Sequence, residues 1–280
     1  MELPATTQLH TCRRGDVVYY TFPAFERIPF VLHGFSTRLG GVSEGIYRSM
    51  NLSFTRGDSL QAVKENFRLF CEAIGVSSDR VVVSAQEHHT RIYNATADDC
   101  GRGVTRERGY TDIDGLLTDE PGVVLCTQYA DCVPLFFVDP VRRVVGTSHS
   151  GWKGTVARIG AVTVERMCRD YGCRRENILA AIGPSIGPCC FEVDEPVYLA
   201  FRQLKEWDDT LARKRAGGKF DLNLWEVNRR ILRQAGIAEG NITVTDLCTK
   251  CHPDVFWSHR VAGKERGSLA GFIALAPDEK

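Results

Sequence analysis

The sequence predicts an α/β protein in which a single domain places helices around a mixed central sheet. Short segments rich in β-formers alternate with longer segments whose apolar residues recur at three- and four-residue spacing. No repeat, low-complexity tract or evident linker interrupts this alternation. We therefore expect residues 1–280 to form one α/β domain.

Eight segments have the composition of buried strands. They are rich in Val, Ile and Phe and end at Gly, Pro or Asp, as buried strands commonly do. The predicted strands span residues 30–38, 80–85, 122–128, 134–139, 143–149, 178–183, 242–247 and 269–275.

Three segments have the periodicity of amphipathic helices. They span residues 59–75, 154–172 and 223–236. Each closes on a glycine, the residue that most readily adopts the left-handed conformation just beyond a helix end. We expect these helices to pack against the sheet.

The composition excludes several kinds of partner. Lys plus Arg and Asp plus Glu both number 35 among the 280 residues, so the chain lacks the basic excess that nucleic acid binding requires. The N-terminus lacks the apolar core of a secretion signal, and no stretch approaches the roughly 18 apolar residues of a membrane span. We expect a cytoplasmic protein that binds neither nucleic acid nor membrane.

Eleven cysteines lie between Cys12 and Cys251, an odd number for a disulfide framework. We interpret most of them as reduced, buried thiols. The Cys248 and Cys251 pair is a weak indication of a redox site. If folding brings Cys189 and Cys190 close to it, the four thiols instead suggest a structural metal site.

Candidate reactive side chains gather where predicted strands end. Asp131 and Cys132 lie at a bend between two strands, where Pro134 disfavours a helix. His149 ends the next strand, 17 residues after Cys132, a separation that fits a strand, turn and strand. We expect Cys132 and His149 to meet at one edge of the sheet.

His88 and His89 follow a third, Val-rich strand. One of them, with Cys132 and His149, would supply a donor set that suits zinc and would leave the fourth tetrahedral position open. Adjacent side chains of an extended segment point in opposite directions, so at most one of the two histidines is a ligand. The alternative is that each histidine is hydrogen-bonded in a loop and that Cys132 is simply packed.

Several segments resemble the YfiH-type purine nucleoside phosphorylase family, long catalogued as multicopper polyphenol oxidases or laccases. They are FSTRLGGVS, ADCVPLFFVDP, HSGWKGT, AIGPSIGPCCFEV and FWSHR, and the resemblance runs from about Phe35 to Arg260. It implies one catalytic domain whose fold is similar to the catalytic domain of the cytotoxic necrotising factor toxins. It also implies that His88, Cys132 and His149 bind one metal ion, zinc or in some accounts copper.

The same resemblance implies activity on purine nucleosides. The implied reactions are phosphorolysis of adenosine, inosine, guanosine and S-methyl-5'-thioadenosine, together with deamination of adenosine. The chain departs from the family pattern around the first ligand, where Glu87 and His89 replace Val and Gly, and further on, where Ser150 replaces Ala and Lys153 replaces Arg. The assignment of His88 over His89 therefore depends on the alignment.

Phosphate needs cationic side chains or free backbone N–H groups. Lys153 follows His149 where a helix is expected to begin, and Arg38 stands before two glycines at another strand end. Arg260 is a third candidate. We predict that these residues bind phosphate or substrate.

Deamination at a zinc site also needs a carboxylate that is not a ligand. Asp131 and Glu87 are both available, and we favour Asp131 because it belongs to the motif.

Other functions remain open from the sequence. Cys132 could act as the nucleophile of a cysteine hydrolase or amidase with His149 as its base. A copper-dependent laccase is disfavoured, because the seven histidines include no His-x-His pair. A non-catalytic nucleoside-binding protein, the preferred nucleoside, and a monomeric or homodimeric state are also left open.

Overall fold

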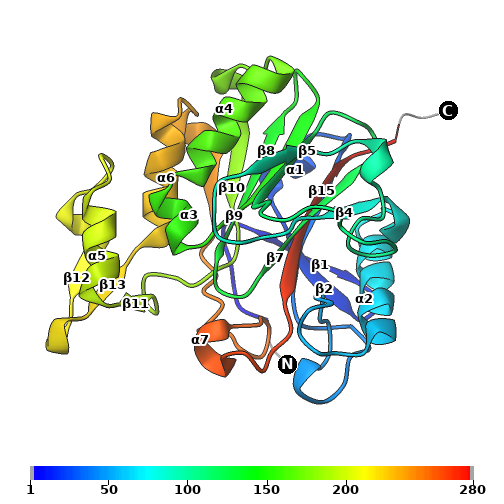
Figure 1. Ribbon diagram of the computed structural model, residues 1–280, viewed down its shortest axis with the longest axis horizontal. Helices are drawn as coiled ribbons and strands as arrows, with labels where there is room; N and C mark the ends of the chain where they lie inside the picture. Colours follow the sequence, from blue (N-terminus) through cyan, green and yellow to red (C-terminus); the bar gives the residue numbers. More distant parts are fainter. Residues whose placement is uncertain (1–2, 278–280) are drawn as a thin grey trace.

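Two six-stranded mixed sheets form the centre of the molecule in this computed structural model, which describes residues 3–277 (Figure 1). The first sheet has the order β1 (His10–Arg14), β2 (Val17–Thr21), β3 (Val31–Ser36), β15 (Leu269–Leu275), β7 (Val124–Tyr129) and β4 (Val81–Val83). The second has the order β14 (Ile242–Val244), β10 (Leu179–Ile182), β8 (Val133–Asp139), β9 (Val144–Ser150), β6 (Gly115–Thr118) and β5 (Ile92–Asn94).

Parallel and antiparallel pairs occur in both sheets. The parallel pairs are β4 with β7, β5 with β6 and β10 with β14, and the other neighbouring strands are antiparallel. A third, small sheet of β11 (Glu192–Val193), β13 (Phe220–Leu222) and β12 (Ala212–Lys214) lies with α5 at the left edge of Figure 1.

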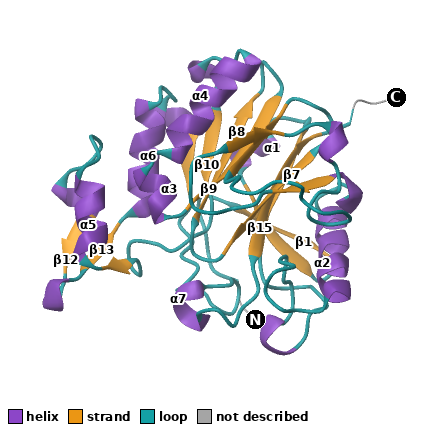
Figure 2. Ribbon diagram, in the orientation of Figure 1, coloured by secondary structure: helices purple, strands orange, loops and turns teal. Residues whose placement is uncertain are grey.

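The three longest helices cover the outer faces of the two large sheets (Figure 2). The α-helices are α1 (Pro23–Glu26), α2 (Leu60–Ala73), α3 (Trp152–Val156), α4 (Ile159–Tyr171), α5 (Glu195–Arg202), α6 (Leu224–Gln234) and α7 (His259–Ala262). Short 3-10 turns occupy Gly45–Tyr47, Ser78–Arg80, Ala97–Asp99, Arg175–Asn177, Asp209–Leu211, Ala216–Gly218 and Glu239–Asn241.

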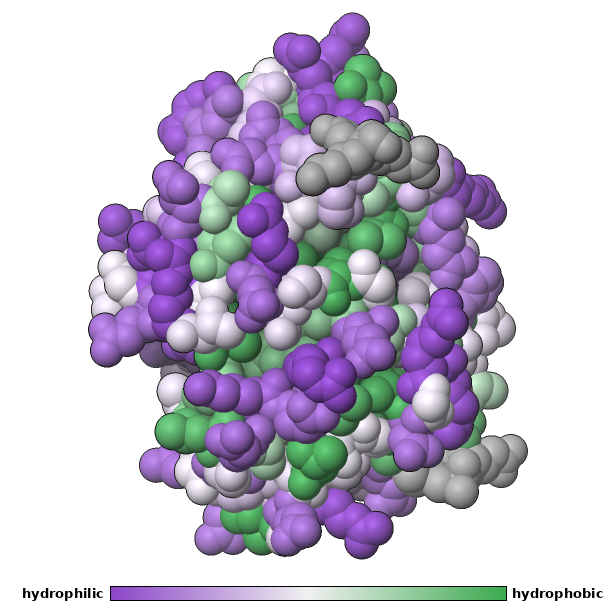
Figure 3. Space-filling model, turned by 90° about the vertical axis from the view of Figure 1, so that its right-hand side faces the viewer, coloured by the Kyte–Doolittle hydropathy of each residue, from purple (hydrophilic) through white to green (hydrophobic). Residues whose placement is uncertain are grey.

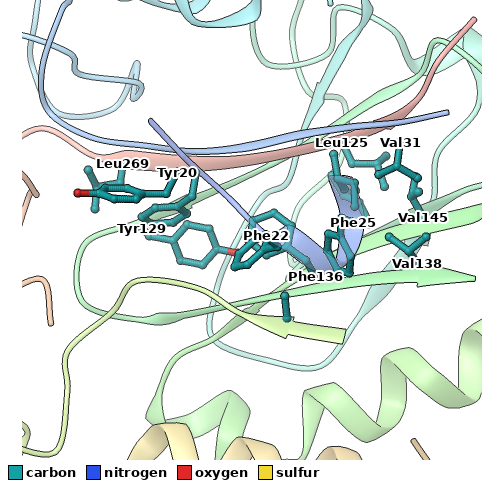
Figure 4. Close-up of a cluster of buried hydrophobic side chains, with 14 of the residues drawn as sticks. Tyr20, Phe22, Phe25, Val31, Leu125, Tyr129, Phe136, Val138, Val145 and Leu269 are labelled. Carbon is teal, nitrogen blue, oxygen red and sulfur yellow. The ribbon is translucent and has the colours of Figure 1, made fainter. Parts of the chain in front are cut away.

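The molecule has four layers, which are α2, the first sheet, the second sheet, and α4 with α6. Three hydrophobic clusters lie between them. The central cluster lies between the sheets, where Tyr20 and Leu125 of the first sheet meet Phe136 and Val145 of the second (Figure 4). A second cluster joins the first sheet to α2, and a third joins the second sheet to α4 and α6. The central strands of each sheet are therefore buried on both faces, which explains why β7, β8, β9 and β15 are largely apolar.

The predicted α/β class, with mixed sheets flanked by helices, is confirmed, and every predicted strand is present. The strands divide between two stacked sheets, which the sequence did not indicate. The likeness to the toxin domain stays a prediction.

The helix predicted over 154–172 is two helices, α3 and α4. They are separated at Arg158, whose φ of 61° is left-handed and interrupts the helical hydrogen bonds. The Arg158 guanidinium is 2.6 Å from the buried carboxylate of Glu206, so an ion pair accompanies the break. Gly75, Gly172 and Gly236 all have positive φ just beyond their helices, as predicted.

Hydrophilic residues surround separate patches of hydrophobic ones on the face shown in Figure 3. Among residues 3–277, no helix is both long enough and apolar enough to cross a membrane.

Candidate metal centre and adjoining pockets

His88, Cys132 and His149 meet at one end of the second sheet. Each contributes one potential ligand atom, and these three atoms lie within 4.8 Å of one another. Cys132 precedes β8 and His149 lies in β9, and these strands form the expected antiparallel hairpin with Pro134 opposite His149. The His88 and His149 rings are 4.8 Å apart between centroids.

The backbone around these side chains is specialised for close approach. His88 and Asp131 both have left-handed conformations, with φ of 65° and 81°. A Cβ on Gly151 would lie 2.5 Å from Nδ1 of His88 and 3.2 Å from Sγ of Cys132. Gly151, two residues after His149, is therefore needed for the three side chains to converge.

Asp114 is a functional residue that the sequence analysis missed. Its buried carboxylate accepts a hydrogen bond from Nδ1 of His149 at 2.8 Å. It also accepts the backbone N–H groups of Glu87, His88 and His89 at 2.9 to 3.1 Å. One carboxylate thus fixes both the His149 ring and the loop that carries His88, as an outer-shell group of a metal site does.

The two histidines of this cluster have opposite pKa shifts. Burial would lower the pKa of His149, but the facing Cys132 and the Asp114 carboxylate raise it to about 9. The pKa of His88 is lowered, by burial and by the neighbouring His149. A positive charge is thus stabilised beside Cys132 and Asp114.

His89 points away from this cluster. Its exposed ring lies with Nδ1 2.6 Å from a carboxylate oxygen of Asp112. The structure therefore places only one of the two adjacent histidines beside Cys132 and His149, and that one is His88.

A large pocket of about 670 Å³ opens beside Cys132. Apolar side chains form much of its wall, namely Trp152, Ile186, Phe191 and Leu224. Its other lining residues are Thr55, Arg56, His88, Ala130, Asp131, Cys132, His259, Arg260, Lys264 and Arg266. The size of this pocket and its lining residues suit a small planar ligand with a few polar groups.

A second, polar pocket of about 180 Å³ shares six lining residues with the first, namely Thr55, Arg56, His88, Ala130, Cys132 and Arg266. Its remaining lining residues are Ser53, Ser84, Gln86, Arg108, Gln128, Tyr129, His149 and Ser268. None of the described residues around it is Asp or Glu. His88 and Cys132 thus line both an apolar pocket and a cationic one, whereas His149 lines only the cationic one.

Arg56 and Arg266 supply cationic charge where the pockets meet. Arg266 is buried, and burial followed by the nearby charge of Arg56 lowers its pKa to about 10. Neither Nε atom finds a hydrogen-bond partner within residues 3–277. Two close guanidinium groups with unused donors favour an anion between them.

Of the three predicted phosphate or substrate residues, only Arg260 lines a pocket. The guanidinium of Arg38 donates to the carbonyl oxygens of Arg48 and Pro253, both at 2.9 Å, and stacks 3.6 Å from the centre of the Trp257 ring. Lys153 is exposed and lines neither pocket. The phosphate role of Arg38 and Lys153 stays a prediction, but the guanidinium of Arg38 is already held by backbone carbonyl oxygens, and neither side chain lines these two pockets.

The carboxylate of Asp131 holds neighbouring loops together. It accepts hydrogen bonds from Oγ1 of Thr249 at 2.6 Å, Oγ of Ser258 at 3.0 Å and the backbone N–H of Arg260 at 2.7 Å. These bonds use both oxygens and favour a positioning role beside Cys132. The acid/base role of Asp131 stays a prediction.

Comparison with known proteins gives consistent similarities. The family described as "Multi-copper polyphenol oxidoreductase laccase" matches residues 32–276. The purine nucleoside phosphorylase YlmD of Bacillus subtilis is 37% identical over 246 residues, covering 88% of each chain. The adenosine deaminase RL5, from an unknown prokaryotic organism, is 35% identical over 84% of this chain and 91% of its own.

A solved structure shows the same fold. The hypothetical protein YfiH of Bacillus licheniformis superposes with a TM-score of 0.89 at 35% identity, covering 96% of this chain and 99% of that chain.

Proposed function

Because the chain belongs to the multi-copper polyphenol oxidoreductase laccase family, whose relatives include purine nucleoside phosphorylases and an adenosine deaminase, we propose that it is a metal-dependent purine nucleoside phosphorylase with adenosine deaminase activity. One observation supports this most strongly. Two members of the cluster, His88 and Cys132, lie on the wall shared by an apolar pocket and an arginine-lined pocket, and the third, His149, lines the arginine-lined one. A purine nucleoside and phosphate could therefore meet beside it.

His88, Cys132 and His149 would hold the metal. Two imidazoles and a thiolate are a donor set that zinc prefers, with one position left for water or substrate. When bound, zinc supplies Lewis-acid chemistry and lowers the pKa of a bound water towards about 7. We propose zinc rather than copper, because the cluster has two imidazoles and not the many that a multicopper site uses.

The purine would occupy the larger pocket. Trp152 and Phe191 offer flat apolar surface to a planar base, and Ile186 and Leu224 add aliphatic contacts. This wall excludes water from one side of the nucleoside. Adenosine, inosine, guanosine and S-methyl-5'-thioadenosine share the purine ring that such a wall recognises.

Phosphate would lie against Arg56 and Arg266, in place of the Arg38 and Lys153 expected from the sequence. Phosphorolysis depends on holding phosphate against C1′ of the sugar and on stabilising charge as the purine leaves. The two guanidinium groups supply the charge and the directed donors for this task. Arg108 lines the same polar pocket and adds to its positive potential.

A cysteine hydrolase is the second candidate function. Cys132, His149 and Asp114 form a thiol, imidazole and carboxylate series, with Asp114 bonded to His149 at 2.8 Å. This is the relay that a cysteine nucleophile uses. In such an enzyme His88 would have no necessary part, whereas a metal site requires it.

Metal analysis and a paired activity assay test the proposal. The purified protein should release adenine and ribose 1-phosphate from adenosine only when phosphate is present, and should form inosine without it. Cys132→Ala should lose both activities and one metal ion. Full activity in a protein shown to be free of metal would refute the metalloenzyme and favour the hydrolase. Blue absorption with several coppers per chain would favour the laccase.

Action of residues 1–280 as one catalytic domain, a cytoplasmic location and a monomeric or homodimeric state all stay predictions.

A further inference from the structure

Four cysteines converge outside the site described above. The Sγ atoms of Cys189, Cys190, Cys248 and Cys251 all lie within 4.8 Å of one another. Cys251 Sγ is 3.5 Å from both Cys189 Sγ and Cys190 Sγ. All four side chains are free thiols, so the cluster is not a pair of disulfides.

The spacing of these sulfur atoms suits a single metal ion. Four thiolates bound to tetrahedral zinc at about 2.3 Å lie about 3.8 Å from one another, simply from the geometry of the tetrahedron. The observed contacts are close to this value. Four neighbouring thiols interact only weakly with one another when no cation lies between them. Four thiolates around zinc, by contrast, form a stable closed site.

The backbone supports the buried member of the cluster. The N–H of Gly187 donates to Cys248 Sγ at 3.2 Å. A Cβ on Gly187 would lie 2.9 Å from the Trp225 ring and 3.2 Å from Cys248 Cβ, so only glycine permits this approach. An N–H bond to sulfur stabilises the thiolate form that a metal ion requires.

The cluster joins two loops that build the candidate site. One loop carries Ile186 and Phe191 of the apolar pocket wall. The other carries Thr249, which donates to Asp131 beside Cys132. A single isolated bridge, Ser185 to Cys248, is the regular pairing between these loops among the described residues.

We propose that Cys189, Cys190, Cys248 and Cys251 bind a second, structural zinc ion, which fastens the apolar wall of the pocket to the loop that holds Asp131. Cys189 and Cys251 are exposed, so an ion can reach the site from solvent. All four positions of the metal are filled by protein, so this zinc has no open position for a substrate.

Counting zinc in variants tests the proposal. The background is Cys132→Ala, which removes a ligand of the other cluster. This variant should retain one zinc per chain, and adding Cys251→Ser or Cys189→Ser should remove it. Because Cys189 and Cys251 are exposed, these substitutions should leave the fold intact, which circular dichroism checks. Adding Cys12→Ser, a half-buried cysteine outside both clusters, should leave the zinc in place.

Cobalt substitution identifies the ligands by spectroscopy. In the Cys132→Ala background, Co²⁺ should give the visible bands of a tetrahedral thiolate site, and Cys251→Ser should weaken them. If the Cys132→Ala protein, prepared with a reductant and zinc, holds no zinc, or holds zinc that Cys251→Ser and Cys189→Ser do not remove, the proposal is wrong. Mass spectrometry that finds a disulfide within the cluster under the same conditions would also overturn it.

This proposal and the proposed function can fail separately. Zinc that is lost on Cys251→Ser but kept on Cys132→Ala supports the second site even if the first binds no metal. Zinc that is lost on Cys132→Ala but kept on Cys251→Ser supports only the first site.

Discussion

The two cysteine-containing clusters of potential metal ligands differ in what surrounds them. His88, Cys132 and His149 offer three ligands and face two pockets, whereas the four cysteines offer four ligands and join two loops. Three protein ligands leave a position for chemistry, and four leave none. We therefore propose that the first cluster takes part in the reaction and that the second supports the pocket wall.

The largest expected effect separates His88 from its neighbour. His88→Asn should lower activity by more than the roughly 10- to 100-fold typical of losing an outer-shell partner, because it removes a ligand itself. Asparagine suits the test because it tolerates the left-handed φ of 65° at this position. Zinc at the first cluster should be lost while the four-cysteine zinc remains.

The matched control is His89→Asn, at the exposed adjacent histidine that pairs with Asp112. It should keep activity and both zinc ions. If His89→Asn instead lost activity and zinc while His88→Asn kept both, His89 would be the ligand.

The charge between the pockets is tested by Arg266→Gln and Arg56→Gln. Each should remove a charge-assisted contact worth about 1.5 to 3 kcal/mol, or about ten- to a hundredfold weaker use of phosphate. Deamination does not consume phosphate and should be retained. Phosphate dependence of adenine release, measured beside inosine formation, checks this.

Lys153→Gln provides the control for these arginines, since Lys153 is exposed and outside both pockets. It should leave phosphorolysis unchanged. Equal loss of both reactions in Arg266→Gln would instead show a general effect on substrate binding or folding.

Support of the first cluster by Asp114 is tested with Asp114→Asn. The substitution keeps the shape but removes the charge that orients His149 and holds three backbone N–H groups. Metal affinity or activity should fall about 10- to 100-fold. Competition with a chelator measures the affinity, and the four-cysteine zinc should be unaffected. An unchanged affinity at the first cluster would contradict the positioning role.

Metal release from either cluster at low pH has to be separated from a loss of folding stability at low pH. His33 is buried, and burial lowers its pKa from 6.5 to about 4. The unfolded chain takes up this proton as the pH falls through 6.5, whereas the folded chain stays neutral until about pH 4. Stability is therefore full above pH 6.5 and falls towards pH 4, by about 3 kcal/mol in total.

Urea unfolding across this pH range measures the loss. His33→Gln cannot titrate but keeps an acceptor for the Phe22 N–H that His33 accepts at 2.8 Å, so it should flatten the dependence. A slope that this variant leaves unchanged would mean that other groups cause it. Metal release is best compared between the clusters above pH 6.5.

Much of the first cluster was predictable from the sequence because its geometry is local. Cys132 and His149 belong to consecutive strands of one hairpin, and a hairpin brings the start of one strand to the end of the other. His88 and His89 point apart as expected, although His88 is left-handed, with φ of 65°, and not part of an extended strand. Resemblance to the family then pointed to His88.

Residues that complete the pockets were not predictable in this way. Arg56 and Arg266 lie far apart in the sequence and meet only because the segment before α2 and the segment before β15 come together. Asp114 stands near other aspartates, and nothing local distinguishes the one that accepts from His149. Arg38 and Lys153 had suitable positions but different partners.

The sequence by itself determined the α/β class, eight of the fifteen strands that the structure describes, the hairpin that unites Cys132 with His149, and the absence of a charge excess. These depend on composition, periodicity and short-range connection, which the chain carries locally. Only the tertiary structure decided that the strands divide between two sheets, because a strand buried on both faces has the same apolar pattern in either one. It also decided which arginines face the pockets and that four scattered cysteines meet, since long side chains and distant loops are placed by packing rather than by their neighbours in sequence.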